Sequence, residues 1–301
     1  MKFGIMGNLQ KPRLEEVSRH LLQFLHAKKI EYCLEESLAQ WLIVRDTELS
    51  IGPAEFIDPD LLASRCDIII ALGGDGTMLN AARLVGSRGT PILGVNLGKL
   101  GFMAEASVDE LENAISEIVR NDYRIDERMV LTVQTDQSPK RYFALNDVVI
   151  DRGLSPRVLN LEASVGAEYL FTLAADGIIL ATPTGSTAYS LASGGPIITP
   201  DSRVIAITPI SPHALTARPV VVPETSVLKI FVAAAVKPVH LIADGQGEDF
   251  FKPPVSFTIR KAEYVVKLVK RKNNSYFDLL RTKLLWGRDT RLAPEPPRGK
   301  N

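Results

Sequence analysis

The chain has 301 residues, of which 46% are hydrophobic and 23% charged, a composition typical of a globular protein rather than a disordered or fibrous one. Its 35 basic and 35 acidic residues give a net charge of zero, which argues against a dedicated nucleic-acid binder. The two cysteines, Cys33 and Cys66, are too few for a disulfide framework. A chain of this length usually divides into two domains.

In the first third, short apolar runs alternate with helical periodicity. The pattern predicts strands at residues 2–6, 30–34, 66–72 and 91–95, and helices at residues 12–28, 78–85 and 108–120. The run at 66–72 is almost continuously apolar, as expected of a strand covered on both faces of a parallel sheet. The alternation predicts an α/β domain over residues 1–125.

After residue 125, short β-type runs separated by turn residues dominate. They lie at 130–135, 142–150, 158–165, 169–173, 204–208, 227–232, 239–243, 256–259 and 265–269. They predict a larger β-rich, β-sandwich-like domain over residues 126–275. Residues 276–286 fit a final amphipathic helix, and the polar, proline-rich tail at 293–301 is expected to be disordered.

The start of the chain and its longest apolar runs indicate where in the cell the protein is expected to be. Glycine and asparagine interrupt the first eight residues before an apolar signal sequence can form. No apolar run approaches the roughly 18 residues of a membrane helix. We therefore expect a cytoplasmic protein with no membrane partner and no nucleic-acid partner.

The sharpest local feature is the run from Gly73 to Thr77, Gly-Gly-Asp-Gly-Thr, directly after the most apolar predicted strand. Glycines let the backbone turn tightly and bring N–H groups close to an anion, and a following helix N-terminus favours a phosphate. A carboxylate among such amides, Asp75, is a candidate general base. The alternative is a plain strand-to-helix turn. Neither a Walker A motif nor the dinucleotide fingerprint is present.

A second feature runs from Asp176 to Ser190, where a predicted strand leads into a turn rich in glycine and hydroxyl residues and then a helix. Small hydroxyl side chains offer donors and acceptors without bulk, and Tyr189 can pack against a flat ring. Taken alone, the segment is explained best by a tight turn capped by threonine and serine.

Together these segments resemble the NAD kinase family. GGDG alone is shared with lipid kinases and phosphofructokinases, whereas the TPTGSTAY run is much more specific. The matching segments are Gly73–Thr77 for the GGDGT motif, Thr182–Tyr189 for TPTGSTAY, Asn146-Asp147 for the Asn-acid pair, 94–102 for the Gly-Phe loop and Asp244-Gly245-Gln246 for the late Asp-Gly element.

The resemblance implies ATP-dependent phosphorylation of the adenosine ribose 2′-hydroxyl of NAD, which gives NADP, with Asp75 as the general base. Gly73, Gly74, Gly76 and Thr77 would form the phosphate loop. The divalent metal, Mg²⁺, would come with ATP, and no residue is assigned as a metal ligand. The family also implies a homo-oligomer, either a dimer or a tetramer, and a last helix that packs back on the first domain.

The resemblance also assigns the NAD-binding residues. Asn146 would meet an adenine edge, and Asp147 would accept from a ribose diol. Thr187 and Tyr189 suit an adenine pocket, and Asp176 can accept from a carboxamide. The full set is Asp75, Gly76, Asn146, Asp147, Arg157, Asp176, Thr187, Ala188, Tyr189, Ser190, Leu191, Ala192 and Gln246.

Two departures from the family pattern affect the expected nicotinamide end. Ala174-Ala175 precede Asp176 where members often have a basic residue and then a small one, and Ala192 stands where serine is frequent. Dinucleotide selectivity is therefore open. The two rival functions are another GGDG-type kinase acting on a lipid or sugar, and a non-catalytic NAD(P)-binding regulator. TPTGSTAY disfavours the first, and Asp75 the second.

Overall fold

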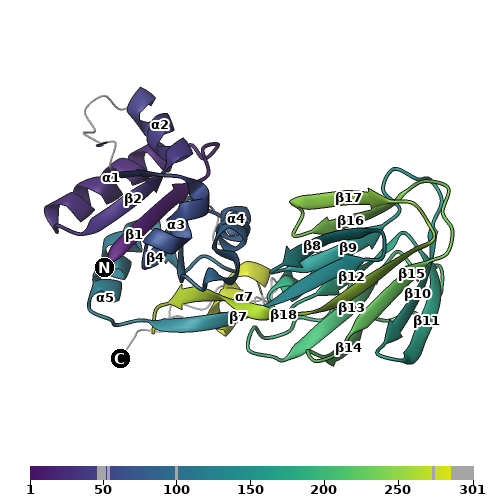
Figure 1. The fold of residues 1–301 in the computed structure, drawn as a ribbon. Coiled ribbons are helices and arrows are strands. Elements are labelled where there is room, and N and C mark those ends of the chain that lie inside the picture. Colours follow the sequence, from purple (N-terminus) through teal and green to yellow (C-terminus); the bar gives the residue numbers. More distant parts are fainter. Residues whose placement is uncertain (46–51, 53–54, 99–100, 273–274, 286–301) are drawn as a thin grey trace, which may run out of the picture.

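The computed structural model describes residues 1–45, 52, 55–98, 101–272 and 275–285. An N-terminal α/β part lies beside a β-rich part, with α7 near their junction (Figure 1). This arrangement confirms the predicted fold class. The elements of the first part are β1 (Lys2–Gly7), α1 (Leu14–Ala27), β2 (Glu31–Glu35), α2 (Glu36–Arg45), β3 (Phe56–Ile57), α3 (Pro59–Arg65), β4 (Ile68–Gly73), α4 (Asp75–Val85), β5 (Ile92–Asn96), β6 (Ala106–Ser107) and α5 (Leu111–Val119).

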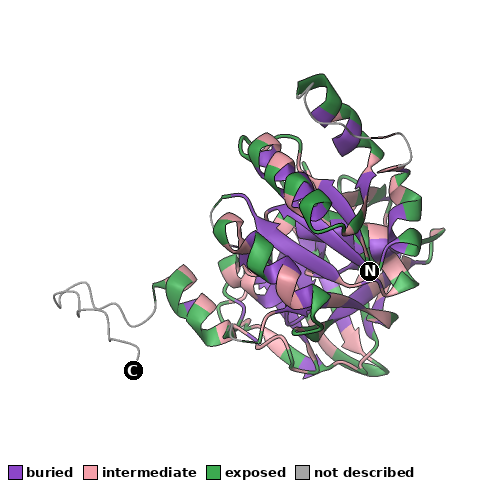
Figure 2. Ribbon diagram, turned by 90° about the vertical axis from the view of Figure 1, so that its left-hand side faces the viewer, coloured by how far each residue is buried: buried purple, intermediate pink, exposed green. Residues whose placement is uncertain are grey.

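The parallel strands of the first part are buried on both faces, as the apolar run predicts. Along β4, Ile68 and Ile70 face one core with helices α1, α2 and α5, whereas Ile69 and Ala71 face the other with α3 and α4. Successive side chains of a strand point to opposite faces, so one apolar run supplies both cores. The buried strands lie between layers of helices that are exposed on their outer faces (Figure 2).

The β-rich part is two sheets packed face to face. Strands β14-β13-β12-β9-β16-β17 form the second sheet, and β7, β8, β10, β11, β15 and β18 belong to the first. Both sheets contribute to one core that includes Leu180 and Phe257. The elements are β7 (Arg124–Thr135), β8 (Ser138–Ala144), β9 (Asp147–Asp151), β10 (Leu159–Val165), β11 (Glu168–Ala175), β12 (Gly177–Ala181), α6 (Tyr189–Ala192), β13 (Val204–Ile210), β14 (Val220–Pro223), β15 (Leu228–Val232), β16 (Val239–Ala243), β17 (Gly247–Phe251), β18 (Val255–Lys270) and α7 (Tyr276–Leu284).

Strand β18 joins the two parts. It pairs with β15 at its beginning, with β7 along most of its length, and through Leu268 with Ile92 of β5 at its end. The parallel strands and half of the β-sandwich therefore belong to one continuous sheet. The predicted boundary between residues 125 and 126 falls inside β7, and the division into three regions stays a prediction.

Four expected elements differ from those observed in where they begin or how they are divided. The helix expected at 78–85 begins at Asp75, so the carboxylate occupies its first position. The run at 142–150 is wrong as a single strand, because it divides into β8 and β9 of different sheets. The runs at 256–259 and 265–269 are one strand, β18, whose pairing with β7 is interrupted between Lys261 and Val265. The tail at 293–301 lies outside the described residues.

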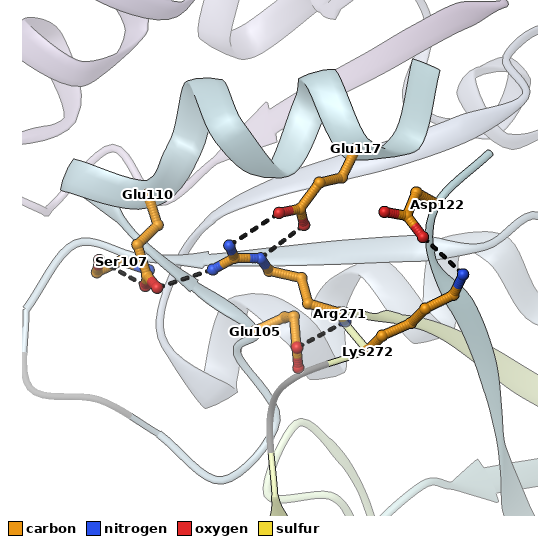
Figure 3. Close-up of polar contacts among 7 residues, drawn as sticks. All are labelled: Glu105, Ser107, Glu110, Glu117, Asp122, Arg271 and Lys272. Carbon is orange, nitrogen blue, oxygen red and sulfur yellow. Dashed lines mark hydrogen bonds and ion pairs between the residues drawn. The ribbon is translucent and has the colours of Figure 1, made fainter. Parts of the chain in front are cut away.

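An ion-pair network fixes the end of β18 (Figure 3). The Arg271 guanidinium donates to both oxygens of Glu117 on α5, at 2.8 and 3.0 Å, and to Glu110 at 2.8 Å. These bonds from Arg271 hold the pKa of Glu117 below its usual value. The backbone N–H of Arg271 donates to Glu105 at 2.7 Å. The network therefore ties the end of β18 to α5 and to Glu105, in the segment between β5 and β6.

Two further observations concern the cysteines and the helices. Cys33 and Cys66 are free and buried. Within the described ranges, no helix combines the length and the apolar character required to cross a membrane.

Candidate active site

Asp75 follows β4 and is held against the loop that follows the neighbouring parallel strand, β5. Its two carboxylate oxygens accept hydrogen bonds from the backbone N–H groups of Phe102, at 2.9 Å, and Met103, at 3.1 Å. The side chain remains partly exposed. Each oxygen keeps a further lone pair, so the carboxylate is oriented by the loop and still able to accept a proton.

The three glycines around Asp75 have different roles. A Cβ on Gly73 would overlap the hydroxyl of Thr77, which is itself buried, so this glycine is required by packing. Gly74 and Gly76 face open space, because a Cβ added at either position would meet no atom within 4 Å. Their backbone is therefore accessible to a ligand at the N-terminus of α4, where partial positive charge favours an anion.

Gly101 is required by the close approach of the loop to Asp75. A Cβ at Gly101 would overlap the Asp75 carboxylate, whereas a Cβ at Gly98 in the same loop would meet nothing within 4 Å. We expect Gly101→Ala to displace the carboxylate and lower turnover at least about tenfold, because misplacing a reacting group is costly. Gly98→Ala is the matched control. Steady-state assays of both variants decide, and equal activities would contradict the role given to Gly101.

The Asn146-Asp147 turn is organised by Asp244, whose importance the sequence did not reveal. The Asp244 carboxylate accepts from the backbone N–H groups of Leu145, Asn146 and Asp147, at 2.7, 2.7 and 3.1 Å. Here the chain leaves β8 for β9, so the carboxylate replaces the strand partners that these N–H groups lack. Asp244 has a positive φ of 54° and begins the late Asp-Gly element, which was the only signal for it.

The Asn146 and Asp147 side chains occupy an enclosed polar position. Burial, and then the charge of Asp244, raise the pKa of Asp147 from 3.8 to about 7. The Asn146 Oδ1 atom is buried and has no hydrogen-bond partner among the described residues. A buried acceptor without a donor is costly and points to a donor supplied by a ligand.

The raised pKa of Asp147 makes a prediction about stability. Because the folded state binds this proton more tightly than the unfolded chain, the associated stability is fully present below about pH 3.8 and is lost as the pH rises towards about 7. We expect the unfolding free energy of the wild type to fall over this window relative to Asp147→Asn, which cannot ionise. Urea unfolding of both proteins between pH 4 and 8 measures the difference, and parallel curves would exclude it.

The 182–190 turn packs directly on Asn146. The Thr182 hydroxyl donates to the Leu145 carbonyl at 2.5 Å, and the Thr182 N–H donates to the Asn146 carbonyl at 2.9 Å. A Cβ on Gly185 would overlap the Asn146 backbone, which explains this glycine. Ser190 is fully buried and its hydroxyl bonds Thr208, at 2.9 Å, so the structure directs this predicted site residue into the core.

A cavity of about 240 Å³ brings the two motifs together. Tyr189, which is 46% exposed, covers one side, and its backbone N–H bonds the Asp147 carboxylate. The lining residues are Asn146, Asp147, Val149, Ala188, Tyr189, Ile242, Asp244 and Gly245. The Gln246 side-chain amide donates to the Gly76 carbonyl at 3.2 Å, which links this cavity to the loop that carries Asp75.

The predicted residues Asp176 and Arg157 lie at the other end of β12. Asp176 precedes β12 and Thr182 follows it, so the strand separates them by roughly 20 Å. Asp176 forms an ion pair with Arg152 Nε at 2.6 Å, and Arg152 is a residue that the sequence analysis missed. Arg157 is exposed. Ala174 and Ala192 are also at least partly exposed.

In the parts of the chain that the structure describes, no group of three or more His, Cys, Asp or Glu side chains is placed to hold a metal ion.

A partly exposed carboxylate beside open glycines at a helix N-terminus, linked through Gln246 to the cavity of Asn146 and Asp147, is an arrangement suited to a small-molecule kinase. Comparisons with known proteins identify the family. The family model of the ATP-NAD kinase N-terminal domain matches residues 3–123, and that of the ATP-NAD kinase C-terminal domain matches residues 145–271. The chain therefore belongs to the NAD kinase family.

Individual relatives cover nearly the whole chain. An NAD kinase of Bacteroides fragilis is 39% identical over 97% of this chain and 100% of its own length. One of Geobacter sp. (strain M21) is 42% identical over 95% and 99%. The crystal structure of yeast NADH kinase complexed with NADH aligns with a TM-score of 0.88 at 26% identity, over 98% of this chain and 90% of that one. An Archaeoglobus fulgidus NAD kinase in complex with ATP shares the fold, with a TM-score of 0.74 at 22% identity over 95% and 99%.

Proposed function

We propose that this chain transfers the γ-phosphoryl group of ATP to the 2′-hydroxyl of the adenosine ribose of NAD, with Asp75 as the general base. The observation that carries the proposal is the Gln246–Gly76 hydrogen bond, which sets the Asp75 loop beside the cavity of Asn146 and Asp147. A ribose held in this cavity would therefore lie next to a carboxylate that can take its proton.

The cavity suits the adenosine half of NAD. The unpartnered Asn146 Oδ1 atom can accept from the adenine amino group, and the exposed Tyr189 ring offers a flat surface for the base. Asp147 can accept from a ribose hydroxyl when ionised. We place the nicotinamide at the opposite end of β12, near Asp176 and its partner Arg152. NAD in this position would lie along β12.

A separate groove suits ATP. It has a volume of about 760 Å³ and lies at the carboxyl ends of β1 and β2, where open α/β sheets usually bind ligands. Asn8, Thr77, Asn80, Arg83 and Arg88 are among its lining residues. The two arginines supply positive charge, and the N-terminal turn of α4 supplies backbone N–H groups. We place the ATP phosphates between this groove and Asp75.

The metal belongs to the substrate, as magnesium bound to ATP. Mg²⁺ is commonly held by one or two carboxylates together with the substrate phosphates. Asp75 is a partly exposed carboxylate whose negative charge favours a cation near the phosphates, so the residues present fit a metal that arrives with ATP while Asp75 itself stays the base. When bound, the metal would neutralise charge on the phosphates.

The proposed mechanism uses alignment and one proton transfer. The Phe102 and Met103 N–H groups orient Asp75 so that it can take the 2′-hydroxyl proton as the oxygen attacks the γ-phosphorus. A positioned base contributes about 10² to 10⁴ in rate. The open backbone at Gly74 and Gly76 and the cationic groove stabilise the charge on the transferring group.

The test is a phosphorylation assay with purified protein, NAD, magnesium and either ATP or polyphosphate. We expect NADP, detected with an NADP-specific dehydrogenase, with ATP as donor. Tight NAD binding without any NADP would favour a non-catalytic regulator, and phosphorylation of a lipid or sugar instead would favour another GGDG-type kinase.

The alanine at position 174 makes a prediction about substrate choice. The oxidised nicotinamide ring is planar and cationic, whereas the reduced ring is neutral and puckered, and Ala174 supplies neither bulk nor charge to separate them. We expect NADH to be accepted with a kcat/KM within about tenfold of that for NAD. Ala174→Arg should shift the ratio towards NAD. A wild type that prefers NAD by about a hundredfold or more would show that Ala174 does not set selectivity.

We also propose that the protein forms a homo-oligomer. Leu154 and Leu215 are 97% and 94% exposed. Each lies two residues after a backbone donor to the proposed nicotinamide end: the N–H of Arg152 donates to the Asp176 carbonyl, and that of His213 to the Ala174 carbonyl. Two exposed leucines beside the proposed nicotinamide end favour a second copy covering it. Light scattering of the purified protein measures the assembly, and a monomer would contradict the proposal. The cytoplasmic location stays a prediction.

A further inference from the structure

A further cavity of about 540 Å³ lies on the β-rich side of α4. It shares Arg83 and Arg88 with the groove proposed for ATP, and its other lining residues lie outside that groove. Leu79 and Ala82 of α4 form one wall, and residues of β8 and of the β16–β17 hairpin form the other. Its volume is within the range of small-molecule sites, which is about 300 to 1,000 Å³. Because Asp244 lines both this cavity and the proposed adenosine cavity, the two share a wall.

The cavity presents aromatic rings. Phe143 on β8 lines the cavity and is 45% exposed, and its ring centroid is 5.6 Å from that of Tyr264. Tyr264 lies within the interruption of the β7–β18 pairing, between Lys261 and Val265. Such irregularities re-aim side chains, often next to functional sites. The rings, together with Val130 and Val266, make a surface suited to a planar apolar group.

The rim of the cavity is cationic. Arg83, Arg88, Lys140 and Arg141 line it, against the single carboxylate of Asp244. Lys140 is paired with Asp249. Arg83 and Arg88 bond neutral oxygens, and no ion pair involves Arg141 within the described ranges. On β8, Arg141 and Phe143 are two residues apart, so they project from the same face of the strand.

We propose that this cavity binds a ligand that combines a planar aromatic ring with a phosphate group, separately from NAD and ATP. The ring stacks on Phe143 and Tyr264. The guanidinium of Arg141 binds the phosphate, because its planar donors match phosphate oxygens. The bound ligand would contact both α4, which carries Asp75, and the wall that contains Asp244.

The test uses 1-naphthyl phosphate as the probe and isothermal titration calorimetry of the whole protein, with NAD and a non-hydrolysable ATP analogue both at saturation. We expect one probe molecule per chain. Arg141→Ala and Phe143→Ala should each weaken binding at least about tenfold, the usual effect of losing a charged hydrogen bond or a stacking ring. Arg260→Ala, an exposed arginine on β18 outside the cavity, is the matched control and should bind as the wild type.

Neutral 1-naphthol and inorganic phosphate test the two halves of the ligand, and each should bind at least about tenfold more weakly than the probe. Arg141 and Phe143 are both exposed, so both variants should keep the wild-type melting temperature. The proposal fails if the ATP analogue or NAD displaces the probe, if 1-naphthol binds as well as the phosphate, or if both variants bind like the wild type. None of these readouts depends on NADP formation.

Discussion

Asp75→Asn should lower turnover by at least about 10²-fold, because the amide cannot take the 2′-hydroxyl proton. The amide keeps one oxygen, which can accept from either Phe102 or Met103, but its NH₂ group would then oppose the other backbone donor. We therefore expect some loosening of the loop as well as loss of the base. NAD affinity, measured by calorimetry, should stay within about tenfold of the wild type, because the contacts proposed for Asn146, Asp147 and Tyr189 remain and the amide can still bond the ribose.

The matched control for this substitution is Asp109→Asn. Asp109 is exposed and lies at the start of the segment leading into α5, away from the cavity. It should leave turnover unchanged. An Asp75→Asn protein that kept more than half of wild-type turnover would remove Asp75 from the role of general base, whatever its NAD affinity.

Asp244→Ala should damage both folding and substrate binding. It leaves the backbone N–H groups of Leu145, Asn146 and Asp147 without their acceptor. Each unpaired buried donor costs about 1 to 3 kcal/mol, and partial access of water reduces the sum, so we expect a loss of about 3 kcal/mol in unfolding free energy. The disordered turn should raise the KM for NAD at least about tenfold, since Asn146 and Asp147 would no longer be held in place.

Two variants separate this role from a general effect of losing an aspartate. Asp244→Asn keeps one oxygen, which can still accept from Asn146 and Asp147, so it should fall between the wild type and the alanine variant. Asp136→Ala removes an exposed aspartate that accepts one backbone N–H, from Ser256 at 3.1 Å, and should cost under about 1 kcal/mol. Denaturant unfolding and NAD kinetics on all three variants measure the order. If Asp244→Ala matched Asp136→Ala, the turn would not depend on Asp244.

The fold class followed from local patterns in the sequence. A continuous apolar run such as the one containing Ile68 to Leu72 predicts a strand buried on both faces, because helices cover both sides of a parallel sheet. Short runs with turn residues between them predicted the β-rich part. The run at 142–150 could not be divided correctly from local patterns. Its apolar character is the same before and after Asn146, while the change of sheet depends on Asp244, about a hundred residues later.

The candidate residues were identified from motifs, but their arrangement came only from the tertiary structure. The sequence by itself determined that a glycine-framed carboxylate, Asp75, follows the most apolar strand, and that an Asn-acid pair and a TPTGSTAY run occur further on. Only the folded chain decided that Gly101 must be glycine, that Asp244 holds the Asn146-Asp147 turn, and that Arg152 pairs with Asp176. The hydrophobic periodicity of a segment indicates its secondary structure and which of its faces is buried. These contacts instead join residues that are 24 to 98 positions apart, and no local sequence pattern indicates which loops will come together.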